Sequence, residues 1–439
     1  MRVGRSARDT LLLVVAFGAA FVLLLQLAQW YDRSAATEKK PDLVTGARGA
    51  FPPPLRADAQ AAPERVIRRT TGDEILVHGL GLRSTDSGVR AVNLRTGERY
   101  WRYERRDTTV RGAWLQVSER TVVIWFPDRK LTAVDLRTGR PLWHTRIQRA
   151  KSLRPATGTV VRGQVVIDVR GSLRALSERG GRTLWSVKPR HACDETPILS
   201  AHAFPDDLTV IRVSCDTLSA PKKNVGPPST TPDVEKSAEL LLGVDDRTGA
   251  LLWERPSLAD DLVAGDEDTL VALDPDRLTP RVDLLDVSRA GVSERGEVRV
   301  RETWATVAGD GLLVSYLDPE IYDIESNTLL SAYDLGDGHP LWTLRAPSRQ
   351  AFGEPAIADG RVYVVRQRDF RYGGADALTG ADLLVLDADT GRQLHTLRLP
   401  ELTAPERVDS RTVLDVAVAD GAVTIRWRSG RNELLVVTD

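Results

Sequence analysis

The sequence predicts an all-β fold: an eight-bladed β-propeller of four-stranded antiparallel blades, with seven blades as the alternative, preceded by one transmembrane helix. Two observations predict the propeller. A strand-turn-strand unit recurs seven times, and its turn glycines are 42 residues apart in three of the six steps. A period of 42 to 50 residues with short strands is typical of propeller blades. An uncharged run near the N-terminus predicts the helix.

The seven units align on one turn and share a short strand, a polar cap, a glycine and a second strand. They are AVNLRTGERYW from Ala91, AVDLRTGRPLW from Ala133, ALSERGGRTLW from Ala175, GVDDRTGALLW from Gly243, LDVSRAGVSER from Leu285, AYDLGDGHPLW from Ala332 and VLDADTGRQLH from Val385. In most units the first strand ends at Asp or Asn, whose side chain can accept backbone N–H bonds, and the following glycine allows positive φ. Each unit therefore predicts two paired strands, and two further strands fit between successive units.

The two chain ends are expected to complete the last blade together. After residue 398 the sequence contains three strand patterns, at Val413–Val418, Val423–Trp427 and Leu434–Val437. No final Trp-containing strand follows them, whereas Glu64–Arg69 stands ahead of the first full unit. Pairing of this segment with the C-terminal strands would close the ring and remove exposed sheet edges. This count gives eight blades.

The pattern Ala-x-Asp-x-x-Thr-Gly-x-x-x-Trp resembles the repeat of the pyrroloquinoline-quinone-type propellers over roughly residues 70–439. That family includes quinoprotein dehydrogenases and the non-enzymatic outer-membrane assembly scaffold of Gram-negative bacteria. The resemblance implies that the repeat Trp packs between neighbouring blades. The matching residues are Trp101, Trp143, Trp185, Trp253 and Trp342. The fifth and seventh units carry Arg295 and His395 there instead, so weaker blade contacts are expected at those places.

The N-terminal part predicts a membrane anchor. Residues 11–30 are uncharged and long enough to cross a bilayer, and Arg2, Arg5 and Arg8 precede them. This charge distribution predicts a cytoplasmic segment 1–10, a signal anchor 11–30, a flexible tether 31–63 and an extracytoplasmic propeller 64–439 in the cell membrane. A cleaved signal peptide is disfavoured because the apolar run is too long and Ser34-Ala35-Ala36 is a poor cleavage site.

Composition and motifs argue against several classes of function. The 60 basic and 61 acidic residues nearly cancel, which disfavours a nucleic-acid partner. No adjacent cysteine pair exists, although the resemblance to dehydrogenases would imply one beside the cofactor. The six histidines show no metal-ligand spacing, and the Asp-containing turns lack the further acids of a calcium site. We therefore expect no catalytic residues, no cofactor and no metal.

The two cysteines, Cys193 and Cys215, flank a predicted hairpin formed by Ile198–Phe204 and Leu208–Cys215. In an exported domain this arrangement favours a disulfide over two buried thiols.

Insertions point to one binding face. The sequence predicts five long connections between second and third strands, at Leu82–Gly88, Asp216–Ser237, Asp274–Pro280, Asp318–Asn327 and Gln367–Ala381. All connections of this kind emerge on the same side of a propeller. Two of these loops combine charges with aromatics, the residue types enriched in interfaces. The candidate binding residues are Asp318, Glu320, Tyr322, Arg368, Phe370, Arg371 and Tyr372.

The sequence thus predicts a non-catalytic binding or scaffolding module for an envelope protein or polymer. A quinoprotein-type dehydrogenase or a small-ligand sensor is the alternative, because propellers host both kinds of function.

Overall fold

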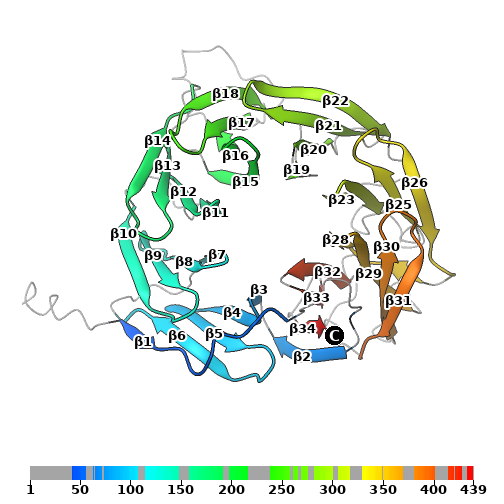
Figure 1. The fold of residues 1–439 in the computed structure, drawn as a ribbon, viewed down its shortest axis with the longest axis horizontal. Helices are drawn as coiled ribbons and strands as arrows, with labels where there is room; N and C mark the ends of the chain where they lie inside the picture. The colour runs from blue at the N-terminus through cyan, green and yellow to red at the C-terminus, as the bar shows by residue number, and fades with distance from the viewer. Residues whose placement is uncertain are drawn as a thin grey trace, which may run out of the picture.

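The structure is a computed structural model. It describes residues 42–55, 63, 65–71, 74–106, 114–147, 158–190, 197–215, 238–257, 261–264, 268–274, 281–299, 305–316, 329–348, 350–368, 380–400, 414–419, 421–427 and 433–438. Within these residues the secondary structure consists of β-strands, which form eight antiparallel sheets. The sheets are arranged side by side around a central opening (Figure 1). This architecture agrees with the predicted β-propeller of four-stranded sheets.

We number the sheets in ring order. Sheet 1 contains β3 (Glu74–Val77), β4 (Leu80–Thr85), β5 (Gly88–Asn93) and β6 (Arg99–Glu104), with β1 (Leu43–Thr45) added outside β6. Sheet 2 contains β7 (Trp114–Val117), β8 (Thr121–Trp125), β9 (Lys130–Asp135) and β10 (Pro141–Arg146). Sheet 3 contains β11 (Gly158–Val161), β12 (Gln164–Asp168), β13 (Leu173–Ser177) and β14 (Thr183–Val187). Sheet 4 contains β15 (Ile198–Phe204), β16 (Leu208–Cys215), β17 (Ala238–Asp245) and β18 (Leu251–Pro256), and its first two strands are the predicted hairpin.

The second half of the ring repeats this order. Sheet 5 contains β19 (Asp261–Ala264), β20 (Thr269–Asp274), β21 (Arg281–Ser288) and β22 (Gly291–Arg299). Sheet 6 contains β23 (Ala305–Gly309), β24 (Leu312–Tyr316), β25 (Leu329–Asp334) and β26 (Pro340–Arg345). Sheet 7 contains β29 (Arg361–Arg368), β30 (Gly380–Asp387) and β31 (Gln393–Arg398), and both β27 (Ala351–Phe352) and β28 (Ala356–Ala358) pair with β29.

Sheet 8 joins the two ends of the chain, which confirms the predicted ring closure. It contains β32 (Leu414–Ala419), β33 (Ala422–Trp427) and β34 (Glu433–Thr438), and its outer strand is β2 (Arg65–Thr71). β2 runs antiparallel to β34, with Arg65 opposite Thr438 and Thr71 opposite Glu433. Because the first and last strands of the ring belong to one sheet, unfolding at either chain end also opens the ring.

The turns form as the repeat predicts. In the second unit, Asp135 Oδ1 accepts the backbone N–H and the hydroxyl of Thr138, both at 2.8 Å. Gly139 follows with φ of 70°. Asn93, Asp245, Asp334 and Asp387 accept turn N–H groups in the same way. Each of these turns is therefore stabilised by contacts among residues of its own repeat and does not require a neighbouring hairpin.

The hydrophobic core lies between the sheets and is divided into eight clusters. Each cluster is built from two sheets that are neighbours in the ring; Val123 and Trp125 of sheet 2, for example, pack with Val165 and Ile167 of sheet 3. Both faces of each sheet are therefore buried, which explains the strands with continuous burial, such as β8, β16 and β24. The cluster between sheets 8 and 1 is small and contains Leu55, Leu76, Leu94 and Ala422.

The five repeat tryptophans lie at the contacts between neighbouring sheets. Indole Nε1 donates to a turn carbonyl of the next sheet in four cases: Trp101 to Leu136 (2.7 Å), Trp143 to Glu178 (2.7 Å), Trp253 to Ser288 (2.9 Å) and Trp342 to Ala388 (2.6 Å). Trp185 instead donates to Gln164 Oε1 at 2.8 Å, and Gln164 donates to the carbonyl of Asp246 at 2.9 Å. The indole N–H groups of all five repeat tryptophans thus donate hydrogen bonds inside the ring.

The turn glycines make room for these rings. A Cβ on Gly139 would lie 2.8 Å from the Trp101 indole, and one on Gly181 would lie 2.6 Å from Trp143. Sheet 5 departs from this pattern, because Arg295 is the bulged residue of β22 and bonds within its own sheet, to Thr269 Oγ1 at 2.7 Å and Asp286 at 3.2 Å. Val298 then lies under the next turn glycine, 3.2 Å from the Cβ position of Gly338.

A matched pair of glycine substitutions isolates this docking contact. Gly97 and Gly139 have φ of 72° and 70°, but a Cβ on Gly97 would meet nothing within 4 Å. Gly97→Ala should cost about 1–2 kcal/mol of backbone strain. Gly139→Ala should cost about 1–3 kcal/mol more, because its methyl group displaces the Trp101 indole. Denaturant unfolding of the two variants measures the difference, and equal costs would show that the indole does not depend on the glycine.

Candidate functional site

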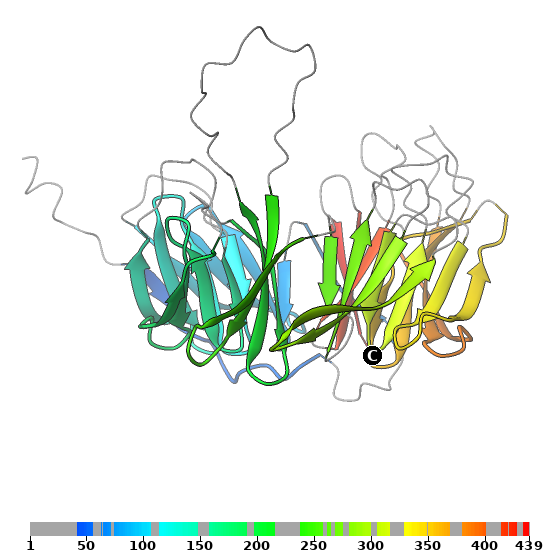
Figure 2. The ribbon, with the colours of Figure 1, turned by 90° about the horizontal axis from the view of Figure 1, so that it is seen from above.

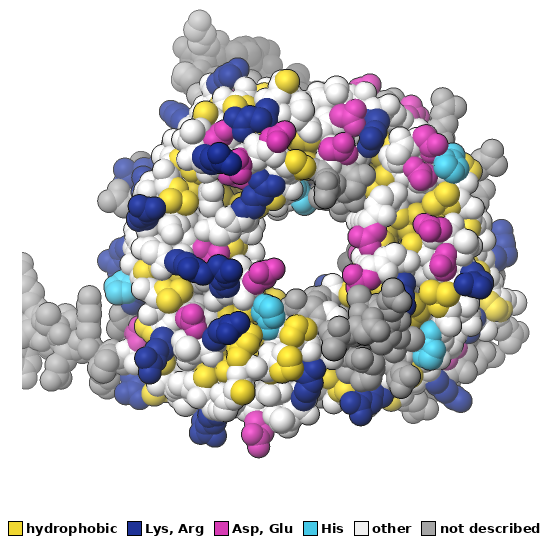
Figure 3. All heavy atoms as spheres, in the orientation of Figure 1, with side chains coloured by type: hydrophobic (Ala, Val, Ile, Leu, Met, Phe, Trp, Pro, Cys, Tyr) yellow, Lys and Arg dark blue, Asp and Glu magenta, His cyan; other side chains and the backbone are white. Residues whose placement is uncertain are grey.

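The strand order gives the ring two different faces. In each sheet the first-to-second and third-to-fourth strand connections emerge on one side, which we call the short-turn face. The connections between second and third strands, and those between sheets, emerge on the other side, which we call the long-loop face. Figure 2 shows the sheets edge-on, with the tight turns along the lower side. The short-turn face is the one seen in Figures 1 and 3.

Most of the predicted binding residues lie outside the described part of the chain. These are Asp318, Glu320, Tyr322, Phe370, Arg371 and Tyr372, whereas Arg368 is the last residue of β29. One of the five predicted long loops is wrong. Leu82–Gly88 contains the end of β4 and a two-residue turn, because Thr85 pairs directly with Gly88. Residues 82–85 belong to β4 and Gly88 begins β5, so no insertion exists there.

Other predicted features also lie outside the described residues. Residues 11–30 are among them, and in the part of the chain that is described there is no helix long and apolar enough to cross a membrane. Cys215 is buried in sheet 4 and is disulfide-bonded, whereas Cys193 is not described.

The prediction of a flexible tether over residues 31–63 is wrong for residues 42–55, which we call the N-terminal strap. β1 of the strap pairs with the outer strand of sheet 1, with Leu43 opposite Glu104 and Thr45 opposite Arg102. The chain then crosses the short-turn face of sheet 1 toward β3 and β2 (Figure 1). The strap was missed because it is held mainly through its backbone, which leaves no hydrophobic pattern in the sequence.

Polar groups of sheet 1 hold the strap at both ends. Arg95, in the turn between β5 and β6, donates to the carbonyls of Pro53 (2.8 Å), Pro54 (2.6 Å) and Leu55 (3.2 Å). At the other end, the Tyr103 hydroxyl donates to Asp42 Oδ2 at 2.7 Å. Burial and the Asp42 carboxylate raise the pKa of Tyr103 far above its ordinary value, so the phenol remains a donor throughout the physiological range.

Two strap side chains bury apolar surface. The Phe51 ring lies 5.6 Å from the His78 ring and 6.3 Å from the Tyr100 ring, and the Arg137 guanidinium of sheet 2 covers it at 4.8 Å. Leu55 is 6 % exposed and completes the cluster between sheets 8 and 1, against which Ile67 of β2 also packs. The strap therefore covers the seam where the two chain ends close the ring.

A second polar network joins sheets 3, 4 and 5 on the short-turn face. Arg162 bonds to Asp246 at 3.2 Å and to the carbonyl of Phe204, and Arg289 bonds to Asp245 and to the carbonyl of Asp206. Hydrogen bonds from Arg289 and Thr248 hold the pKa of Asp245 well below its ordinary value. Arginines in turns thus link neighbouring sheets repeatedly on this face.

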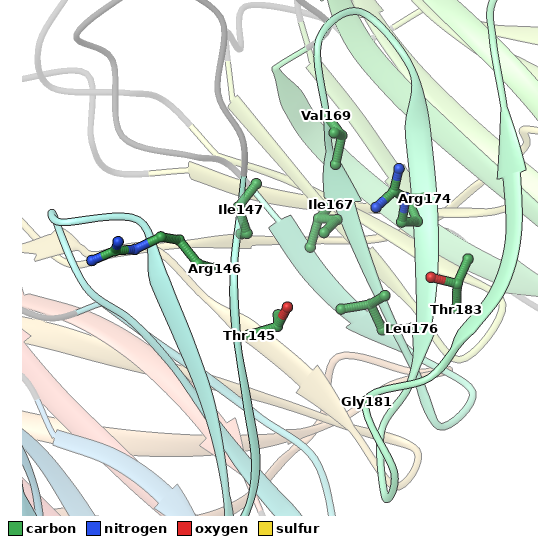
Figure 4. Close-up of a pocket in the computed structure, with 9 residues that line it drawn as sticks. All are labelled: Thr145, Arg146, Ile147, Ile167, Val169, Arg174, Leu176, Gly181 and Thr183. Carbon is green, nitrogen blue, oxygen red and sulfur yellow. The ribbon is translucent and has the colours of Figure 1, made fainter.

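A cleft of about 320 Å³ opens between β10 of sheet 2 and sheet 3 (Figure 4). Its walls are aliphatic, from Ile147, Ile167 and Leu176, with the polar groups of Thr145, Thr183 and Arg174 around them. The Arg146 side chain points away from the other lining residues. The described lining contains no carboxylate, histidine or cysteine, so it provides no general base. Its aliphatic walls and Arg174 are suited to a small apolar or anionic group.

One group of potential metal ligands occurs in the described residues, at the turn between β25 and β26. Side-chain atoms of Asp334, Asp337 and His339 lie within 4.8 Å of one another. Asp334 Oδ1 already accepts the backbone N–H groups of Gly336 (2.6 Å) and Asp337 (3.3 Å). The arrangement is therefore explained by capping of this repeat turn. In the sequence, the spacing of His339 from Asp334 and Asp337 does not match a metal-binding motif.

The comparison with protein families shows which family this chain belongs to. The sequence matches the family described as outer membrane protein assembly factor BamB over residues 57–171 and 169–433. The chain belongs to this family. It is a β-propeller repeat protein of the pyrroloquinoline-quinone type, as the repeat predicts. A search of curated proteins found no match.

Solved structures with similar folds include BamB and quinohemoprotein alcohol dehydrogenases. BamB from Moraxella catarrhalis is 14 % identical, with a TM-score of 0.48 over 85 % of this chain and 99 % of that one. A quinohemoprotein alcohol dehydrogenase from Pseudomonas putida is 16 % identical, with a TM-score of 0.48 over 88 % and 78 % of the two chains. The enzyme from Comamonas testosteroni is 14 % identical, with a TM-score of 0.45 over 92 % and 77 %.

The strap contact can be tested with two arginines that occupy neighbouring turns. Arg95→Gln removes charged hydrogen bonds to three strap carbonyls and should cost about 1–3 kcal/mol. It should also raise amide hydrogen exchange in β1 and around Leu55. Arg140→Gln, in the equivalent turn of sheet 2, should change neither quantity because Arg140 does not contact the strap. Equal exchange in the wild type and both variants would mean that Arg95 does not hold the strap.

Proposed function

We propose that this chain is a membrane-tethered, extracytoplasmic, eight-bladed propeller that binds an envelope protein or polymer and acts as a scaffold without catalysis. Membership of the BamB family supports a binding or scaffolding role. The eight sheets and the pairing of β2 with β34 support eight blades in one closed ring.

The strap is the observation that carries the proposal. Its extended chain lies on the short-turn face, where Arg95 binds its carbonyls and Phe51 occupies an aromatic and guanidinium site. An extended segment held by backbone acceptors and one aromatic anchor is a common mode of peptide recognition. The propeller surface is therefore suited to binding chain segments. The tryptophans, by contrast, are engaged between sheets, which supports structural docking over stacking on a cofactor.

The strap also shortens the proposed tether. If residues 11–30 form the anchor, residues 31–41 link it to β1, and a chain of that length spans at most about 40 Å. β1 begins opposite Glu104, at the end of β6 that approaches the long-loop face. We therefore propose that the long-loop face lies near the membrane and that the short-turn face points away from it. A partner at the long-loop face would then be bound close to the membrane.

Crosslinking in intact cells tests binding and location together. A membrane-impermeant crosslinker should join the full-length chain, tagged after Asp439, to a partner. Combined Tyr322→Ala, Phe370→Ala and Tyr372→Ala substitutions should abolish the adduct without changing the melting temperature, because we expect these aromatics to contribute affinity but little stability.

A matched control removes exposed apolar side chains from the outer rim. Leu142, Leu184 and Leu394 are 41 %, 38 % and 42 % exposed, and their combined replacement by Ala should leave the adduct intact. An adduct that forms only after lysis would contradict the extracytoplasmic location. A quinone found by absorbance or mass spectrometry in the purified chain would instead favour the dehydrogenase alternative.

A further inference from the structure

The short-turn face carries an arginine patch on sheets 2 and 3. Arg95 binds the strap from the second position after the capping residue of its turn, and the same position of the next two repeats is occupied by Arg137 and Arg179. Both are exposed. The guanidinium that binds chain carbonyls on sheet 1 is thus repeated on sheets 2 and 3, where Arg137 already contacts the strap through the Phe51 ring.

Two features make these two sheets more basic than sheet 1. The position held by Glu98 in sheet 1 is held by Arg140 and Arg182, and the turns between first and second strands add Arg120 and Arg162. The complete patch consists of Arg120, Arg137, Arg140, Arg162, Arg179 and Arg182, all of them exposed.

The acids among these turns offset only part of the patch. Glu119 is exposed beside Arg120 and is one carboxylate against six guanidinium groups. Asp135 caps its own turn, and Glu178 is buried and accepts a hydrogen bond from Ser118. Arg162 is paired with Asp246 of sheet 4. The side chains of Arg120, Arg140, Arg179 and Arg182 make no hydrogen bond or ion pair with the part of the chain that the structure describes.

The opposite side of the same face has the reverse charge. The turns of sheets 6 and 7 carry Asp310, Asp334, Asp337, Asp359, Asp387 and Asp389. Figure 3 shows this division: Lys and Arg side chains gather over sheets 2 to 4, whereas Asp and Glu predominate over sheets 5 to 7. A face divided in this way orients a charged partner as it approaches.

We propose that the arginine patch binds an extended acidic segment of a partner protein, laid across sheets 2 and 3 as the strap is laid across sheet 1. Guanidinium groups bind carboxylates through paired, charge-assisted hydrogen bonds, and they also donate hydrogen bonds to backbone carbonyls, as Arg95 does. The partner segment must be acidic because Arg140 and Arg182 replace the Glu98 of sheet 1. This inference goes beyond the proposed function, which assigned partner binding to the long-loop face.

The test measures peptide binding by the full-length chain in zwitterionic detergent, where neither the topology of the anchor nor an envelope partner is needed. A fluorescent peptide of alternating Glu and Pro should bind, and its dissociation constant should rise steeply with salt. Replacing Arg120, Arg140, Arg179 and Arg182 by Gln should weaken binding about tenfold, since four charge-assisted contacts are lost.

The control has the same change in net charge. Arg170, Arg345, Arg392 and Arg398 are exposed arginines elsewhere on the ring, and their replacement by Gln should change the dissociation constant less than about twofold. Equal weakening by both sets would reduce the effect to net charge and overturn the proposal. Equal binding of a Gln-Pro peptide would overturn it as well, and so would a patch that binds inorganic polyphosphate but not the acidic peptide. Circular dichroism and melting curves confirm that all variants are folded.

Discussion

The structure depends on the closure of the ring, because the described core clusters are each shared by two sheets that are neighbours in the ring. Eight clusters of apolar side chains lie at the eight contacts between sheets, and burial of apolar surface on this scale is the main favourable contribution to folding. A gap between two sheets would expose the cluster between them to water. The contact between sheets 8 and 1 is the place where this risk is greatest, since sheet 8 is assembled from both chain ends and its cluster is small. Leu55 of the strap is one of the four buried side chains there.

The strap therefore stabilises the ring, and it also determines which face of the ring lies nearer to the proposed anchor. It fills the seam through Leu55, and β1 extends sheet 1 at the rim. Because β1 begins opposite Glu104, at the long-loop end of β6, the proposed anchor ahead of residue 42 would restrain that side of the ring and leave the short-turn face free. The arginine patch lies on this free face, next to the segment that shows how an extended chain is bound there.

The repeat was readable from the sequence because each turn is determined locally. Asp135, Thr138 and Gly139 contact one another within a few residues, and the Trp that docks beneath the next glycine occurs at a fixed spacing. The pairing of β2 with β34 followed from counting strands. The strap could not be predicted in this way, since Arg95 recognises its backbone carbonyls and its composition is that of a linker. The arginine patch is visible in the sequence as Arg at the same position of three successive repeats, namely Arg95, Arg137 and Arg179. The repeat alone does not predict a binding surface, because only the closed ring places these residues on one face.

Comparison of two N-terminal truncations tests most directly whether the strap stabilises the seam between sheets 8 and 1. Removal of residues 1–41 leaves every described strap contact in place and should leave the melting temperature of the propeller unchanged. Removal of residues 1–56 deletes β1, Phe51 and Leu55 but keeps β2, and it should lower the melting temperature by about 5 °C or more, because the apolar seam between sheets 8 and 1 becomes exposed. The same melting temperature for both truncated forms would show that the seam is stable without the strap and would contradict this account.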